Sequence, residues 1–283
     1  MGTADLVPGV SGGTIALVLG IYERLVASIK EGSSALGSIL KGDVGAFRDH
    51  LSRVEWLFLI PLLVGILLAV VLLASFLEHQ LEERPTILAG VFLGLVLASI
   101  GIAWRILRDP RAHHPMIAAL VAVIIFLLLG VGEGRVADQP AVMVFFGAGA
   151  LAICAMILPG ISGSLILLMI GMYAPVLSAV TDRSYTTLAV FAAGAIVGLA
   201  LFSQILNWAL ENHHDTVLAA LIGLMAGSTR VLWPWPDGVE SPNLGAPETD
   251  WPGVVVALVV GASVVYLITR LAPEDPDVHL AGG

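Results

Sequence analysis

The sequence predicts an all-α polytopic integral membrane protein. Of its 283 residues, 58% are hydrophobic and only 12% are charged, whereas soluble domains carry about 25% charged residues. The apolar residues fall in long runs, and a helix needs roughly 20 of them to cross a bilayer. A membrane β-barrel would instead alternate apolar and polar residues in segments of about ten. These observations favour a bundle of membrane-spanning helices.

Eight apolar runs are candidate spans, separated by short polar segments. A shorter apolar stretch at 14–29 precedes them, and the longest connection, 30–53, is polar and glycine-containing and is therefore expected to be a loop. We expect the run at 141–158 and the one after it to enter and leave the membrane on the same side, either as a re-entrant hairpin or as two full crossings. The eight runs are 56–77, 86–107, 115–131, 141–158, 164–180, 186–210, 216–233 and 251–271.

An internal repeat runs through the chain. The stretch VPGVSGGTIALVLGIY at 7–22 recurs as LPGISGSLILLMIGMY at 158–173, at an offset of 151 residues. Further matches follow at an offset of 129, where Gly94 corresponds to Gly223. A fixed order of matches over about a hundred residues indicates duplication. Only six residues precede the first copy, so we expect the chain to begin short of the arm that 141–157 provides for the second.

The distribution of basic residues predicts that the two halves are inverted. Lysine and arginine gather before residue 56 and between 105 and 111, and the positive-inside rule assigns these segments to the cytoplasm. The acidic connection at 78–84 is then outside. With about three spans per half, we expect two inverted-topology repeats, 1–135 and 136–283, within a single transmembrane domain. Many secondary transporters have this plan.

Each Pro-Gly-x-Ser-Gly motif predicts a broken or re-entrant helix whose N-terminus points into the protein. Proline suits the first turn of a helix, and Ser11 and Ser162 are good capping residues. A helix N-terminus carries about half a positive charge and attracts phosphate. Irregular backbone at membrane depth persists only where it lines a cavity or is buried in protein. The two motifs are therefore expected to face one another around one anion, unless they only break helices and allow close packing.

Several ionisable residues are further candidates. Arg230 lies in or just beyond an apolar span, where it could hold phosphate in a bidentate manner or anchor the chain at the membrane surface. Asp5 and Glu23 flank the first motif, and either could carry a coupling proton. Alternatively, Asp5 caps the broken helix and Glu23 pairs with its neighbour Arg24.

We expect no metal and no bound cofactor, although transport could be coupled to protons or sodium. Two pairs of adjacent histidines could be metal ligands, but both fall in predicted loops. Without carboxylates at ligand spacing, such pairs are expected to be solvated. The histidine pairs are His113-His114 and His213-His214.

Three stretches, MGTADLVPGVSGGTIALVLGIYERL, ILPGISGSLILLMIGMY and GLMAGSTRVLWPW, resemble the PopT-type undecaprenyl phosphate translocases, a family of bacterial polytopic membrane proteins. The resemblance covers nearly the whole chain. It implies a protein of the bacterial cytoplasmic membrane that returns the C55 lipid carrier of peptidoglycan assembly from the outer to the inner leaflet. The expected partners are then a polyprenyl phosphate and the bilayer, with no nucleic acid, and a homodimer is an assembly to test.

Carried over to this sequence, the resemblance places the headgroup in the two motifs, and Thr14 and Arg230 complete the phosphate-binding set that we expect. The motif residues are Pro8, Gly9, Ser11, Gly12 and Gly13 with Pro159, Gly160, Ser162, Gly163 and Ser164.

Two alternatives remain. Membrane undecaprenyl pyrophosphate phosphatases resemble this chain in their inverted Pro-Gly-x-Ser turns, but an arginine follows their serine where this chain has Gly12 and Gly163. They also use a Glu-x-x-x-Glu pattern, which is matched here only by Glu78 and Glu82 at an acidic helix end, so we expect no enzyme. A transporter or channel for a small soluble anion would use inverted helix termini equally well.

Overall fold

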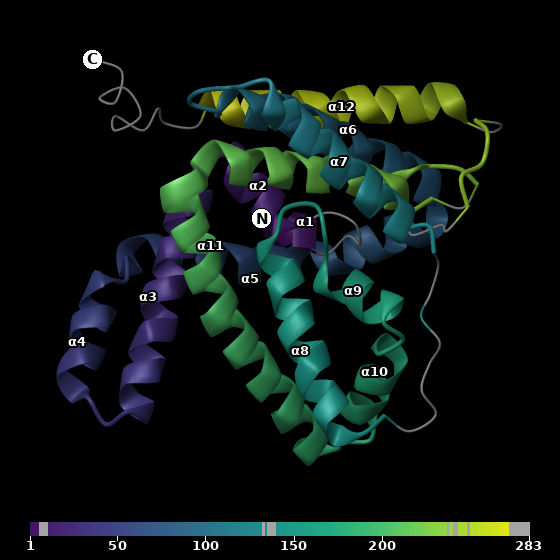
Figure 1. Ribbon diagram of the computed structural model, residues 1–283. Helices are drawn as coiled ribbons and strands as arrows, with labels where there is room; N and C mark the ends of the chain where they lie inside the picture. Colours follow the sequence, from purple (N-terminus) through teal and green to yellow (C-terminus); the bar gives the residue numbers. More distant parts are fainter. Residues whose placement is uncertain are drawn as a thin grey trace.

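The computed structural model describes residues 1–5, 11–131, 134, 140–236, 238–239, 243–247 and 250–271, and every regular element within them is a helix (Figure 1). The elements are α1 (Gly2–Asp5), α2 (Gly12–Val18), α3 (Tyr22–Leu40), α4 (Val44–Arg53), α5 (Trp56–Glu83), α6 (Pro85–Arg105), α7 (His113–Leu128), α8 (Val142–Ile157), α9 (Gly163–Met169), α10 (Tyr173–Thr181), α11 (Tyr185–Ser228), the 3₁₀ helix η1 (Thr229–Leu232) and α12 (Trp251–Leu271).

Within these residues, four helical segments are long and apolar enough to cross a membrane. They are α5, α6, α11 continued by η1, and α12. Helices α9 and α10 pass the same test as a pair, but the chain bends by 110° between them, and α7 and α8 are shorter apolar helices. All eight predicted runs lie on helices. The chain is thus a helical, multi-pass membrane protein.

The two runs predicted at 186–210 and 216–233 are joined in one helix, α11, of 44 residues. At 1.5 Å per residue such a helix extends about 66 Å, roughly twice the hydrocarbon thickness of a bilayer. Its backbone leaves helical geometry at His213, where φ is −138° and ψ is 42°. The break divides α11 into two apolar arms, and the polar residues Glu211–Asp215 lie between these spans rather than within either.

The prediction of a loop at 30–53 is wrong, because this segment forms the end of α3 and all of α4. The carboxylate of Asp43 caps α4 by accepting a 2.9 Å hydrogen bond from the amide of Ala46. His50 Nδ1 lies 2.8 Å from Glu31 Oε2 and links the two helices. Polar residues and glycines suggested a loop, but α3 and α4 pack against each other and α3 also packs along α11.

The helices form two packed groups that α11 connects (Figure 1). Helices α6 and α7 pack on the second arm of α11, and α12 packs on α6. Helices α8 and α10 pack on the first arm, and α9 packs on α8. Glycines allow the closest approaches, since a Cβ at Gly94 of α6 would overlap the carbonyl of Leu258 in α12, and one at Gly194 of α11 would overlap the carbonyl of Phe146 in α8. Small residues at helix contacts are typical of membrane bundles.

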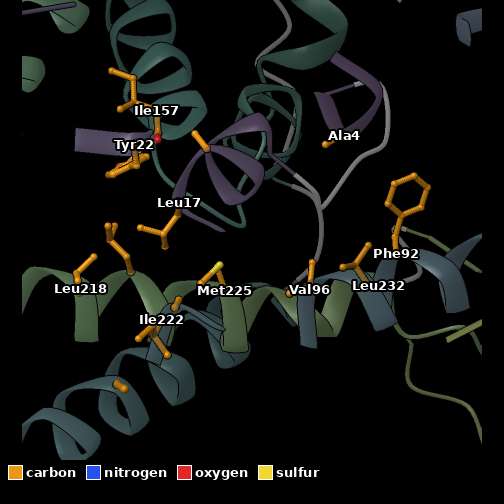
Figure 2. Packing of buried hydrophobic residues seen from close by; sticks show 14 of the residues in the cluster. Ala4, Leu17, Tyr22, Phe92, Val96, Ile157, Leu218, Ile222, Met225 and Leu232 are labelled. Atoms are coloured by element: carbon orange, nitrogen blue, oxygen red, sulfur yellow. Dashed lines mark hydrogen bonds between the residues drawn. The ribbon is translucent and has the colours of Figure 1, made fainter. Parts of the chain in front are cut away.

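The main buried cluster lies where the first motif meets the second arm of α11 (Figure 2). Leu17 of α2 and Tyr22 of α3 point toward Leu218, Ile222 and Met225. Burial of such side chains contributes roughly 1.5–3 kcal/mol each. The helix that follows the first motif is therefore anchored in the centre of the molecule.

Candidate functional site

The two copies of the motif take the same local structure. In each, a short helix ends at a glycine of positive φ, which is +71° at Gly20 and +70° at Gly171. The amide of the residue after each glycine donates a hydrogen bond back across the turn. Ile21 donates to the carbonyl of Ala16 at 3.0 Å, and Met172 donates to the carbonyl of Leu167 at 2.8 Å. Glycine is favoured where φ is positive. The repeated Gly-x-Tyr sequence therefore ends one helix and starts the next.

Both motif serines cap their helices, which confirms the capping prediction. Ser11 Oγ accepts a 3.1 Å hydrogen bond from the amide of Gly13, and Ser162 Oγ accepts one of 3.2 Å from the amide of Leu165. Each hydroxyl has a second contact. Ser11 donates to the carbonyl of Met156 at 3.3 Å. Ser162 Oγ lies 3.1 Å from the hydroxyl of Ser164, which is exposed, whereas Ser11 is buried.

The first motif lies against the residues that lead into the second. A Cβ at Gly13 would be 2.9 Å from the carbonyl oxygen of Ile157 and 3.4 Å from the nitrogen of Pro159. Ser11 and Tyr22 both donate to the end of α8, to Met156 and Ile157 respectively. The structure thus brings together two segments that are about 150 residues apart in sequence.

The second motif packs on α8 and on the second arm of α11. Gly160 has a φ of +88°, and a Cβ there would be 2.8 Å from both Met225 Cα and Ser228 Oγ. A Cβ at Gly163 would be 2.9 Å from the carbonyl oxygen of Ala152. Neither glycine leaves room for a side chain, so these contacts fix the backbone that leads into α9.

Thr14 lies in the first turn of α2. The residue is 0% exposed, and its Oγ1 has no hydrogen-bond partner within the described part of the chain. Leaving such a group unsatisfied costs about 1–3 kcal/mol. Native proteins keep few of them, and a missing water, ion or ligand is a common reason.

The remaining predicted residues are placed differently. Arg230 lies in η1, with its guanidinium carbon 4.8 Å from the ring centroid of Phe126 and against Gly130 at the end of α7. It follows Ser228, the neighbour of Gly160, by two residues. Pro8 and Gly9 lie outside the described residues. Asp5 ends α1, and its side chain is likewise outside the described part.

Glu23 takes part in a charged cluster at the break of α11. Its Oε1 is 2.7 Å from His214 Nε2, and its Oε2 is 3.8 Å from the guanidinium of Arg108. Arg24 pairs instead with Glu55, through an Nε–Oε2 hydrogen bond of 2.6 Å. The expected Glu23–Arg24 pair is therefore not the contact formed, because adjacent helical residues do not face each other. Sequence reasoning missed the partner His214 because it lies 191 residues away.

Asp215 completes this cluster. His214 Nδ1 lies 2.8 Å from Asp215 Oδ1, and the two carboxylate oxygens of Asp215 accept hydrogen bonds from the amides of Arg108 and Asp109. Burial alone would raise the pKa of Asp215, but these hydrogen bonds outweigh burial and lower the pKa to about 2. The carboxylate therefore stays ionised and connects the end of α6 to α11.

The histidines are not all solvated as expected. His114 is buried in α7, and its Nδ1 accepts a 3.0 Å hydrogen bond from the amide of Arg111. His214 is only 10% exposed, whereas His213 is exposed with its ring edge against Trp208. No group of three or more metal-ligating side chains is assembled among the described residues.

A cavity of about 400 Å³ opens beside the cluster, between α3, the end of α6 and the first arm of α11. It combines two guanidinium groups, two carboxylates and a carboxamide with a small apolar surface. A phosphate group with an apolar tail could be accommodated by such a lining. The lining residues are Glu23, Arg24, Ala27, Arg108, Asn207, Leu210 and Glu211.

Apolar helices long enough to cross a membrane define a helical membrane protein, and comparison with known proteins identifies its family. The chain belongs to the VCA0040-like family, described as undecaprenyl phosphate translocase-like, whose model matches residues 1–246. The resemblance predicted from the motifs is thereby confirmed.

Two relatives are similar along most of their length. A polyprenyl-phosphate transporter of Vibrio cholerae serotype O1 is 41% identical over 240 residues, which cover 83% of this chain and 75% of that protein. A polyprenyl-phosphate transporter of Staphylococcus aureus is 31% identical over 294 aligned positions, which cover 97% of this chain and 95% of that protein. No solved structure matches this chain.

Proposed function

We propose that this protein transports a polyprenyl phosphate, undecaprenyl phosphate in the first instance, across the bacterial cytoplasmic membrane. The lipid carrier would return from the outer to the inner leaflet for reuse in peptidoglycan synthesis. Both relatives are polyprenyl-phosphate transporters, which supports the substrate class. Direction follows from the need to recycle a carrier that is released outside.

The observation that carries the proposal is the meeting of the two motifs next to a buried, unsatisfied hydroxyl. Gly13 packs on the entry to the second motif, and Thr14 Oγ1 has no protein partner in the described residues. Hydroxyls and helix amides around an irregular backbone can hold an anion without a buried cation. We therefore assign the headgroup to both motifs, together with Thr14 and Arg230.

In this proposal the two motifs belong to inverted repeats, and the headgroup crosses by alternating access while the isoprenoid tail stays in lipid. Inward movement of an anion opposes an inside-negative potential, at about 2.3 kcal/mol per charge and 100 mV. Coupling to protons or sodium would supply this energy, with Asp5 and Glu23 as candidate coupling residues. Hydrolysis is not part of the proposal, because glycine rather than arginine follows Ser11 and Ser162.

Reconstitution into liposomes tests the function. Undecaprenyl phosphate with a radioactive phosphate is placed in both leaflets, and an impermeant phosphatase is added outside. The protein should raise the cleaved fraction from about half toward completion, as inner-leaflet lipid becomes accessible. Unchanged accessibility together with uptake of inorganic phosphate would identify a soluble-anion transporter, and release of phosphate without the added phosphatase would identify an enzyme.

Variants of the second motif link this assay to the site. Gly163→Ala introduces a Cβ at 2.9 Å from the carbonyl oxygen of Ala152, whereas a Cβ at Gly147 of α8 meets nothing within 4 Å. We expect Gly163→Ala to slow lipid exchange at least tenfold and Gly147→Ala to leave it unchanged. Equal exchange by both folded variants would show that the motif is a packing device.

A further inference from the structure

The break in α11 carries a histidine that two carboxylates hold. His214 follows the non-helical residue His213 and lies at the corner between the two arms of α11 (Figure 1). Its Nε2 faces Glu23 of α3 at 2.7 Å and its Nδ1 faces Asp215 at 2.8 Å. A neutral imidazole has only one N–H, so it can donate to one carboxylate but not to both. With both carboxylates ionised, the imidazolium is the form that satisfies this geometry.

The surrounding charges favour that form. The hydrogen bond that His214 donates to Glu23 raises the pKa of His214 above its usual 6.5, and the one that it donates to Asp215 adds to this, although burial opposes both. The same hydrogen bond lowers the pKa of Glu23, and Arg108 contributes in the same direction. The cluster of Glu23, Arg108, His214 and Asp215 is neutral when His214 is protonated and carries one negative charge when it is not.

All charged groups on the adjoining elements belong to this electrostatic setting. Helix α3 contributes Glu23, Arg24, Lys30 and Glu31, of which Lys30 lies 3.8 Å from Glu211 of α11, and Glu55, before α5, pairs with Arg24. The segment after α6 contributes basic and acidic groups, and α11 contributes its own titratable residues. These are Arg108, Asp109, Arg111, His113 and His114 after α6, and Glu211, His213 and Asp215 on α11.

The cluster shares Glu23 and Arg108 with the 400 Å³ cavity. While His214 is protonated, Glu23 is neutralised by a cation behind the cavity wall, and the guanidinium group of Arg108 can attract an anion, whereas that of Arg24 is paired with Glu55. When His214 loses its proton, the negative charge of Glu23 is no longer neutralised, and it repels an anion in the cavity. The charges are within a few ångströms of each other, where Coulomb interactions are weakly screened. Binding of a proton and of an anion should therefore favour each other.

We propose that His214 is a proton-binding site and that its proton sets the affinity of the adjoining cavity, a second site apart from the two motifs, for a phosphate headgroup. The inference rests on the proposed function, because it takes the ligand to be a phosphate monoester with an apolar tail. Loss of the proton leaves His214 able to donate to only one of Glu23 and Asp215, which weakens the link between α3 and the break of α11 and lowers the affinity for the anion. A polyprenyl phosphate and a proton would thus travel inward together.

Ligand binding to the full chain in detergent tests this proposal. Farnesyl phosphate serves as a short polyprenyl phosphate and inorganic phosphate as the soluble anion, between about pH 7 and pH 9.5. In this range the phosphate monoester stays largely dianionic, because its second pKa is about 6. Affinity of the natural protein for farnesyl phosphate should fall by up to about tenfold per pH unit above the pKa of His214. His214→Gln should bind it with an affinity that does not vary with pH.

Two histidines provide matched controls. His213 is the neighbour of His214 but is exposed and packs on Trp208, and His50 forms a similar carboxylate pair with Glu31 on another helix. His213→Gln and His50→Gln should keep the pH dependence of the natural protein. The same pH dependence in His214→Gln would overturn the proposal. If His214→Gln does not fold, Glu23→Gln carries the test, because the inflection should move to lower pH, and an unchanged inflection would overturn the proposal.

Other outcomes of these measurements distinguish the kind of ligand bound and test the proposed function separately. pH-linked binding of inorganic phosphate without binding of farnesyl phosphate would overturn the headgroup assignment and leave a site for free phosphate. Lipid exchange in liposomes with no pH linkage of binding would overturn this inference alone. Absence of exchange by the natural protein would overturn the proposed function itself.

Discussion

The phenol of Tyr22 donates a 3.2 Å hydrogen bond to the carbonyl oxygen of Ile157, across 135 residues of sequence. Tyr22 closes the first motif, and Ile157 is the last residue of α8 before the second. The tyrosine is 1% exposed, whereas its counterpart in the second copy, Tyr173, is 44% exposed. Two residues that the repeat makes equivalent therefore have different environments, and one of them ties the two motifs together.

Replacing Tyr22 by Phe should destabilise the protein by about 1–3 kcal/mol, because the buried carbonyl of Ile157 loses its donor. Thermal unfolding of the full chain in detergent measures the effect. Tyr173→Phe is the matched control and should shift stability by less than about 0.5 kcal/mol, since the surface substitution removes no buried hydrogen bond. Equal effects of the two changes would contradict the role assigned to the Tyr22–Ile157 bond.

Thr14→Val should separate ligand binding from folding. Valine keeps the shape of threonine and removes the unsatisfied hydroxyl, so the folded state should be equally stable or more stable by about 1 kcal/mol. If the hydroxyl serves the headgroup, lipid exchange should nevertheless fall at least tenfold. Thr14→Ser, which retains a hydroxyl, should keep most of the exchange rate. A Thr14→Val protein with the natural exchange rate would remove Thr14 from the site.

Much of the architecture is predictable because it depends on local sequence. The apolar runs locate the helices, Ser11 and Ser162 cap as expected, and the repeated Gly-x-Tyr marks a turn that only a glycine adopts easily. Where local signals conflict, the prediction is wrong. The 30–53 segment has the polar composition of a loop, yet it is helical, with α3 packed along α11 and α4 packed on α3.

The charged cluster could not be predicted in the same way. Glu23, Arg108 and His214 come from three distant parts of the chain, and each alone resembles an ordinary surface residue. Only the break at His213 and the fold of α3 along α11 bring them within 2.7 to 3.8 Å of one another. The adjacent carboxylate in His214-Asp215 was the available signal, since a histidine beside an acid between two apolar spans has little reason to be there unless it is paired.

Gly94→Ala should disrupt the contact between α6 and α12. The added Cβ would overlap the carbonyl of Leu258, so the two helices would have to separate, and overpacking of this kind costs about 1–3 kcal/mol. Gly101, in the same helix, has nothing within 4 Å of an added Cβ. Gly101→Ala should stabilise α6 by roughly 0.5–1 kcal/mol. Thermal unfolding of both variants gives the comparison, and destabilisation by both would show that the contact is not the cause.

Gly20→Ala should destabilise the turn of the first motif for a purely conformational reason. Nothing lies within 4 Å of an added Cβ, but φ is +71°, and this region costs other residues roughly 1–2 kcal/mol. Gly37 in α3 also has open space around it, and Gly37→Ala should stabilise by roughly 0.5–1 kcal/mol. Gly20→Asn should be milder than Gly20→Ala, because asparagine tolerates positive φ. We expect the unfolding temperature to be highest for Gly37→Ala, lower for Gly20→Asn and lowest for Gly20→Ala.

The stability of the fold should fall on the alkaline side in a way that depends on His214. Its folded-state pKa is raised, so its contribution is complete below about pH 6.5 and is lost as the pH rises through the folded-state value. Glu23 and Asp215 act with the opposite sign, because their pKa values are lowered, and their contribution is lost only in acid. Between these limits the cluster holds α3, the end of α6 and α11 together.

Unfolding temperatures measured from neutral to alkaline pH should decrease in the natural protein and in His50→Gln. Asp215→Asn removes the negative charge of one of the two acceptors of His214, so the alkaline decrease should begin at lower pH. A curve parallel to that of the natural protein would show that Asp215 does not sustain the charge of His214.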